Sequence, residues 1–155
     1  MITRRSSGLL LHRTVASRWE VLIGHMGGPL WSRRDAAAWS VPKGEHEPGE
    51  ESAAAARREF TEELGIPAPD GELIDLGSVT QSNKKIVTVY AIRADPDLSA
   101  FSPGTFEMEW PRGSGQLRQF PEIDRVRWFA LDEAREKLVR AQREFLDRLA
   151  AKLAG

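Results

Sequence analysis

Three glutamates, Glu59, Glu62 and Glu63, stand in the sequence at positions i, i+3 and i+4. On a helix this spacing places all three carboxylates on one face, where they repel one another and call for a positive partner. Hard divalent cations such as Mg²⁺ and Mn²⁺ take oxygen ligands of this kind and are often shared with substrate phosphates. The pattern therefore indicates a Mg²⁺ or Mn²⁺ site, and the alternative is the solvated acidic face that most charge runs form.

Two neighbouring features favour the metal interpretation. Neither Glu62 nor Glu63 has a Lys or Arg four residues later to pair with, because Ile66 and Pro67 stand there. Arg58 directly precedes Glu59 and could hold a carboxylate in place from the side.

The segment that carries these glutamates has the composition of a helix. Pro48 and Gly49 mark a turn, and residues 53–56 are four alanines, the best helix-forming residue. Gly65 stands where a C-terminal cap is expected, and Pro67 blocks continuation. An apolar side at roughly helical period predicts packing on a sheet; it consists of Ala55, Ala56, Phe60 and Leu64.

Length and composition set the broad class. The chain has 155 residues, with 22 basic and 23 acidic side chains and a net charge of −1, so we expect a single domain over residues 1–155. Balanced charge argues against general nucleic-acid binding, and the lack of cysteine excludes disulfides and thiolate sites. With no run of 18 apolar residues and no signal peptide, we expect a cytoplasmic protein without a membrane partner. The oligomeric state is left open.

Further elements must position the glutamates. Strands are predicted at residues 8–12, 20–25, 73–80, 86–93 and 125–131. Helices are predicted at 132–138 and 140–153, the last with an apolar stripe that indicates core packing. Residues 26–38 and 94–122 are predicted to be irregular, and a loop as long as the second is usually functional. This order of elements predicts an α/β fold with a mixed sheet covered by helices on both faces.

Residues 44–66 resemble the Nudix box, G-x5-E-x7-R-E-U-x-E-E-x-G-U, in which U is a bulky apolar residue. Every fixed position matches at the required spacing: Gly44, Glu50, Arg58, Glu59, Glu62, Glu63, Gly65 and Ile66. Phe60 fills the first U position, which is usually aliphatic, and this departure affects packing rather than chemistry. The resemblance implies the Nudix α/β/α sandwich, with the box as loop-helix-loop. It also implies a pyrophosphohydrolase that depends on Mg²⁺ or Mn²⁺.

The resemblance implies roles for the box residues. Glu59, Glu62 and Glu63 would hold one or more cations, together with the backbone carbonyl of Gly44. One glutamate must also act as general base, and which one is left open. Arg58 is expected to orient Glu50 or Glu59 rather than to contact substrate.

An acidic residue outside the box is a further metal-ligand candidate. Glu122 lies shortly before the predicted strand at 125–131, where a similar residue reaches the metal cluster in nucleotide-cleaving Nudix enzymes. The alternative is an exposed loop carboxylate, and Asp124, Glu107 and Glu109 are rivals for the role.

The residues before the box bear on the substrate. Trp39-Ser40-Val41-Pro42-Lys43-Gly44 is similar to the W-x-x-P-K-G lead-in of diadenosine tetraphosphate hydrolases, of related mycobacterial-type nucleotide hydrolases and of diphosphoinositol polyphosphate phosphatases. Lys43 is expected to contact phosphate, the alternative being a surface lysine at a turn. Lys84 and Lys85 resemble a basic pair of the dinucleotide enzymes, and Lys85 is taken as a second substrate contact.

The implied substrate is a small nucleoside polyphosphate, most like diadenosine tetraphosphate. Two alternatives stay open: removal of oxidised nucleoside triphosphates, and a non-catalytic Nudix-fold module that senses nucleotides. Residues 26–38 and 94–121 are longer than in the compact dinucleotide enzymes, so they are expected to border the cleft and to set specificity. Three aromatic residues could stack on a base, although each is more often a core residue: Tyr90, Trp110 and Phe120. The three histidines lack ligand spacing, and His12 and His25 are expected to be ordinary sheet residues.

Overall fold

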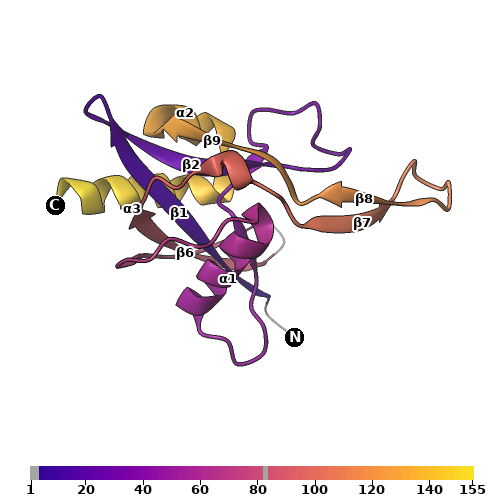
Figure 1. Ribbon diagram of the computed structural model, residues 1–155, viewed down its shortest axis with the longest axis horizontal. Helices are drawn as coiled ribbons and strands as arrows, with labels where there is room; N and C mark the ends of the chain where they lie inside the picture. The colour runs from indigo at the N-terminus through magenta and orange to yellow at the C-terminus, as the bar shows by residue number, and fades with distance from the viewer. Residues whose placement is uncertain (1–3, 82–83) are drawn as a thin grey trace.

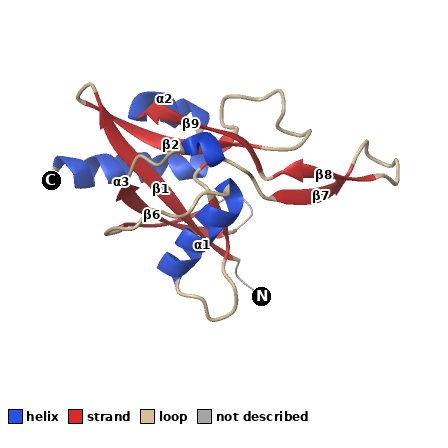
Figure 2. Ribbon diagram, in the orientation of Figure 1, coloured by secondary structure: helices blue, strands red, loops and turns tan. Residues whose placement is uncertain are grey.

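The computed structural model describes residues 4–81 and 84–155, and it has the predicted α/β/α architecture. A mixed sheet lies between helix α1 (Ser52–Leu64) on one face and helices α2 (Leu131–Lys137) and α3 (Arg143–Ala154) on the other (Figures 1 and 2). The sheet strands are β1 (Arg5–Val15), β2 (Arg18–Met26), β3 (Trp39–Ser40), β4 (Lys43–Glu45), β5 (Ile74–Thr80), β6 (Ile86–Arg93) and β9 (Ile123–Ala130). All five predicted strands are confirmed; β6 has the predicted ends and the other four have shifted ends.

Strand β1 lies at the centre of the sheet. The main strand order is β3-β2-β1-β6-β5, with β4 added to β1 and β9 added to β2. The β1–β6 pair is parallel and runs from Arg5 opposite Ile86 to His12 opposite Arg93, whereas the other pairs are antiparallel. A central strand is buried on both faces, which explains the unbroken apolar run in the middle of β1.

Each face of the sheet has its own hydrophobic core. Successive β1 side chains alternate between the two cores, so that Leu10 packs on one face and Leu9 and Leu11 on the other. Helix α1 covers the second face with Phe60 and Leu64. The predicted apolar stripe of α3 is confirmed as core packing on the first face, through Phe145, Leu146 and Leu149. The segment before α3 forms a 3₁₀ turn, η2 (Arg140–Gln142), rather than continuing the α-helix as predicted.

The boundaries of α1 follow the predicted signals. The turn before the helix contains Gly49 at φ +76°, and the helix ends at Gly65, which has φ +68°. The Gly65 N–H donates to the Thr61 carbonyl at 2.7 Å. A Cβ on Gly65 would also lie 2.4 Å from the Ser102 carbonyl oxygen, so both the backbone conformation and the space require glycine.

The prediction that residues 94–122 form a mostly irregular loop is wrong. After a 3₁₀ turn, η1 (Leu98–Ala100), they form an antiparallel hairpin of β7 (Thr105–Glu109) and β8 (Leu117–Pro121). The hairpin projects from the body of the molecule (Figure 1). The alternation is weak in β8 because its two polar residues, Arg118 and Gln119, are adjacent and the strand ends in proline. Cross-strand pairs hold it instead, including Phe106 and Phe120 with ring centroids 6.0 Å apart.

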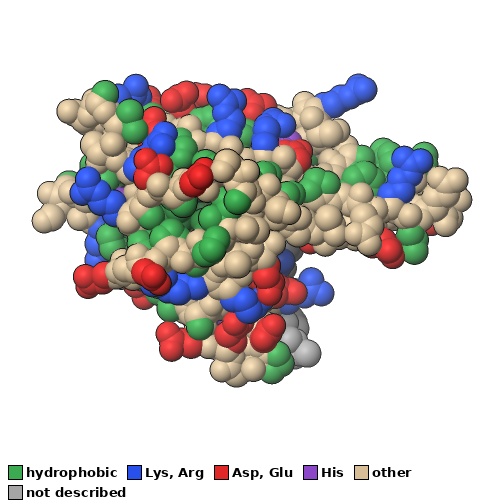
Figure 3. Space-filling view, viewed as in Figure 1, with side chains coloured by type: hydrophobic (Ala, Val, Ile, Leu, Met, Phe, Trp, Pro, Cys, Tyr) green, Lys and Arg blue, Asp and Glu red, His purple; other side chains and the backbone are tan. Residues whose placement is uncertain are grey.

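The surface carries both signs of charge. On the face shown in Figure 3, acidic and basic side chains are interspersed around hydrophobic ones. Within residues 4–81 and 84–155, no helix combines the length and apolar character needed to cross a membrane.

Candidate functional site

Arg58 organises the carboxylates of the box. Its Nε and Nη2 donate to the two oxygens of Glu50 at 2.7 and 2.8 Å, a bidentate contact. Its Nη1 donates to Glu59 at 2.9 Å and to Glu62 at 3.0 Å. The Arg58 bonds, followed by that from the Glu47 backbone, lower the pKa of Glu50 to about 2. A fixed guanidinium fork therefore sets the orientation of three glutamates at once.

Glu62 stands apart from the other two glutamates of the triplet. The sequence showed no basic residue four positions later, but Arg58 lies four positions earlier and pairs with it. The Glu62 side chain is 58% exposed. The structure therefore holds Glu62 at the solvent side of Arg58.

An acidic cavity of about 400 Å³ lies beside α1. Its wall combines residues of β1, β4 and α1 with the residues that directly precede β6 and β9, and these segments are far apart in the sequence. The lining side chains and backbone belong to Ser6, Lys43, Gly44, Glu45, Glu59, Glu63, Lys85 and Glu122. Of the sequence candidates, the cavity brings together Lys43, Gly44, Glu59, Glu63, Lys85 and Glu122, and it leaves out Glu50, Arg58 and Glu62.

The structure distinguishes between the four acidic residues that were candidates for the additional metal ligand. Glu122 lines the acidic cavity, whereas Asp124 bonds to the His25 ring. Glu109 accepts a hydrogen bond from the Gly113 N–H at 2.7 Å, and Glu107 is exposed on β7. Of these four residues, Glu122 is the one that faces the box glutamates.

Burial and mutual repulsion perturb the groups in the acidic cavity. Burial, followed by the charges of Glu122 and Glu59, raises the pKa of Glu63 to about 8. Burial also raises the pKa values of Glu59 and Glu122, against the opposing effects of Arg58 and Lys43 respectively. These carboxylates are costly to ionise together, and a bound cation would reverse that cost.

The residues present fit a divalent cation by donor chemistry. Glu59, Glu63 and Glu122 offer hard carboxylate oxygens, and the Gly44 carbonyl is a further oxygen at the same wall. A Cβ on Gly44 would lie 1.9 Å from Glu59 Oε2, so glycine leaves the space that the Glu59 carboxylate fills. Within the described residues no three acidic side chains converge into a finished ligand set. Glu59 Oε1 accepts a hydrogen bond from Arg58, whereas Oε2 lies beside Gly44 at the cavity wall.

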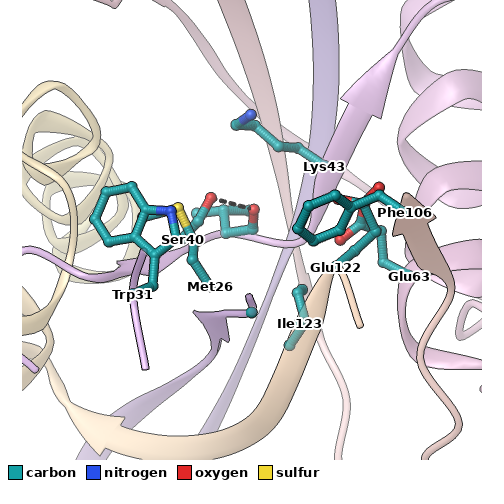
Figure 4. A pocket seen from close by; sticks show the side chains of 10 residues that line it. Met26, Trp31, Ser40, Lys43, Glu63, Phe106, Glu122 and Ile123 are labelled. Carbon is teal, nitrogen blue, oxygen red and sulfur yellow. Dashed lines mark hydrogen bonds between the residues drawn. The ribbon is translucent and has the colours of Figure 1, made fainter. Parts of the chain in front are cut away.

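Two less polar cavities adjoin the acidic one. The first, about 290 Å³, is shown in Figure 4, with Glu63, Glu122 and Phe106 on one side and Met26, Ser40 and Trp31 on the other. The second, about 480 Å³, shares Met26, Trp31, Ser40 and Lys43 with it and adds residues of η2 and Gln81. Lys43 borders all three cavities, and burial lowers the pKa of its ammonium group. The three cavities are therefore parts of one cleft.

The aromatic residues of this cleft differ from those that the sequence suggested. Trp31, in the loop between β2 and β3, and Phe106, on β7, line it. Tyr90, Trp110 and Phe120 line none of the three cavities, and Tyr90 packs on the α1 side of the sheet. Residues 26–38 and 94–121 do border the cleft, as predicted, through Met26, Trp31 and Phe106. A lone tryptophan in a Gly-Pro loop beside two arginines was the available signal for Trp31.

The two strand histidines are both buried, but they differ in their bonding. His12 is 2% exposed, and neither of its ring nitrogens has a hydrogen-bond partner among the described residues. His25 is fully buried, with Nδ1 2.9 Å from Asp124 Oδ1 and Nε2 2.6 Å from the Arg34 carbonyl oxygen. Both histidines lie in sheet strands as expected, and His25 in addition has hydrogen-bond partners at both ring nitrogens.

Comparison with known proteins gives a consistent family match. The NUDIX domain model matches residues 3–149. Among solved structures, a C. elegans Ap4A hydrolase binary complex is 22% identical, with a TM-score of 0.69 over 97% of this chain and 98% of that one. The NUDIX domain of Shewanella oneidensis NrtR complexed with ADP ribose is 12% identical, with a TM-score of 0.67 over 99% and 90%. A mutT/nudix family protein from Listeria innocua is 18% identical, with a TM-score of 0.64 over 99% and 96%. No curated protein matches the sequence significantly.

Proposed function

The chain belongs to the Nudix family, whose members hydrolyse pyrophosphate bonds, and from that premise we propose that it cleaves a dinucleoside polyphosphate of the diadenosine tetraphosphate type. The observation that carries this proposal is the position of Lys43. Its side chain borders the acidic cavity and both less polar cavities. A polyphosphate held by Lys43 could therefore extend from the box glutamates toward two separate compartments.

Nudix hydrolases generally use divalent metal ions, and we propose Mg²⁺ or Mn²⁺ here. Glu59, Glu63, Glu122 and the Gly44 carbonyl would hold the ion. When bound, such an ion neutralises phosphate oxygens and acidifies a water molecule. Arg58 and Glu50 keep Glu59 oriented toward the cavity wall.

The cleft supports a substrate with an organic group at each end of the phosphates. The two less polar cavities measure about 290 and 480 Å³, and Trp31 borders both, where it can stack on a base. Lys43 and Lys85 supply positive charge toward phosphate oxygens on the acidic side. The Pro-Lys-Gly lead-in and the likeness to the C. elegans Ap4A hydrolase fold point in the same direction.

A substrate screen tests the proposal. The protein would be incubated with Mg²⁺ or Mn²⁺ and with diadenosine tetraphosphate, an oxidised purine triphosphate, a nucleotide sugar or ADP-ribose, and the products resolved by chromatography. We expect the highest kcat/KM on diadenosine tetraphosphate. A higher value on the oxidised triphosphate would replace the proposal with nucleotide clean-up. Binding of nucleotides without turnover of any, by folded protein, would favour the sensor module.

A further inference from the structure

We propose that His25 is a positioning residue that aims Glu122 into the acidic cavity and holds the Trp31 loop against the same cleft. This inference rests on the proposed function, because it assigns His25 a part in building that site. His25 itself lines none of the three cavities and acts through its two hydrogen-bond partners.

The first partner is the extra residue of a β-bulge. In the β2–β9 pair, His25 lies opposite Arg125 and the next residue, Met26, lies opposite Ile123. Asp124 is therefore left without a cross-strand partner. Bulges of this kind occur beside active sites, where they redirect a side chain. The residue redirected here is Glu122, two positions before the bulge.

The bulge has to be held, because regular pairing competes with it. A shift of one residue in a strand turns every side chain to the opposite face of the sheet. The Glu122 backbone is fixed on both sides, since its N–H donates to the Gly104 carbonyl at 2.8 Å and its C=O accepts from the Gly27 N–H at 3.0 Å. His25 adds the side-chain contact at the bulge itself, with Nδ1 2.9 and 3.1 Å from the two Asp124 oxygens. Loss of this contact removes the side-chain hydrogen bonds that favour the bulged register.

The second partner holds the opposite wall. His25 Nε2 lies 2.6 Å from the carbonyl oxygen of Arg34, in the loop that carries Trp31. The Arg34 guanidinium lies 5.5 Å from the Trp31 ring centroid, so the same residue contacts both the histidine and the aromatic wall. A single buried side chain thus links the metal-binding wall to the wall proposed to bind a base.

The His25 ring is held on both sides. One ring nitrogen contacts the Asp124 carboxylate and the other contacts the Arg34 carbonyl oxygen. Its ring is fully buried and packs edge-on against Trp39 at a centroid distance of 5.2 Å, which keeps it from rotating.

Substitution of Asp124 tests the His25–Asp124 contact through which Glu122 is proposed to be positioned. We expect Asp124→Ala to lower kcat about tenfold, with KM changed by less than about twofold, as for other residues that support a metal ligand. Asp124→Asn keeps an acceptor oxygen and should restore most of the rate. The matched control is Asp70→Ala, which removes an exposed carboxylate from the loop between α1 and β5. Thermal unfolding of each variant shows whether it is folded at the assay temperature.

A double-mutant cycle separates positioning from general structural support. In a Glu122→Gln background, Asp124→Ala should lower kcat by less than about twofold, because the side chain that Asp124 helps to position has already lost its charge. Independent, multiplicative losses would overturn the proposal, as would an Asp124→Ala variant as active as the Asp70→Ala control.

One readout does not depend on turnover. Asp124→Ala should weaken Mn²⁺ binding, followed by electron paramagnetic resonance, by about tenfold. Unchanged Mn²⁺ affinity would overturn the positioning role. Absence of hydrolysis by a wild-type protein whose Mn²⁺ binding responds as expected to Asp124→Ala would instead refute the proposed function.

Discussion

Gly44 offers the sharpest test of the site, because a single added carbon would disturb one ligand and little else. In Gly44→Ala the new Cβ would lie 1.9 Å from Glu59 Oε2 and 2.1 Å from Glu59 Cδ. Ordinary contact requires roughly 3.5 Å between such atoms, so the carboxylate must move by about 1.5 Å. A misplacement of about 1 Å can cost about 10²-fold in rate. We therefore expect kcat to fall about 100-fold.

The effect on stability should be small. The displaced atoms are the end of a flexible side chain, and alanine within a strand is favoured over glycine by about 0.5–1 kcal/mol. The partial loss of the Glu59–Arg58 hydrogen bond acts in the opposite direction. We expect a Tm within about 4 °C of wild type, the shift that about 1 kcal/mol produces in a domain of this size.

A matched glycine provides the control. Gly113, in the turn of the β7–β8 hairpin, has φ +76° and no atom within 4 Å of an added Cβ. Gly113→Ala carries backbone strain of about 1–2 kcal/mol, yet it should leave kcat unchanged. Hydrolysis of diadenosine tetraphosphate at saturating Mg²⁺ and scanning calorimetry would be measured for both variants. A folded Gly44→Ala protein that keeps kcat within about threefold of wild type would refute the role given to Glu59.

Three further outcomes are expected. Arg58→Lys replaces a fork that contacts three glutamates with one ammonium group, so kcat should fall at least about tenfold in the same assay; an unchanged rate would contradict the orienting role. Trp31→Ala should raise KM for the dinucleotide about tenfold at nearly constant kcat, and an unchanged KM would exclude stacking by this residue. Burial followed by the charge of Arg93 lowers the pKa of His12, so the unfolded chain binds that proton more tightly and stability is lost as the pH falls below about 6.5. Between pH 7 and pH 5, denaturant unfolding should therefore show a smaller decrease in the free energy of unfolding for His12→Leu than for wild type. Parallel plots of unfolding free energy against pH would contradict this.

The architecture could be predicted from local patterns because its main elements carry strong signals. Helix α1 has alanines, a turn before it and Gly65 after it, and these signals are local. β6 was predicted with its observed ends because it alternates well. The β7–β8 hairpin was missed because only β7 alternates, and its pairing partner β8 is recognised only through cross-strand pairs such as Phe106 with Phe120.

The site was predictable where spacing along one helix determined it. Once the helix is known, its spacing predicts the relative positions of Glu59, Glu63 and Arg58. Glu122 was considered as a candidate only because of the family resemblance. Trp31 and His25 could not be predicted in the same way. Their surroundings come from the packing of residues 26–38 against β9, which no window of neighbouring residues contains.

The central position of β1 also has a consequence for folding during synthesis on the ribosome. β1 can pair with β2 as soon as the short turn between them has been made, because that hairpin is local. Its other edge needs β6, in which Ile86 pairs with Arg5. At a synthesis rate of roughly 5–20 residues per second, that edge stays unpaired for several seconds after β1 is made. An apolar strand with an open edge is a template for aggregation, so the interval before β6 emerges is the one in which the nascent chain most needs protection.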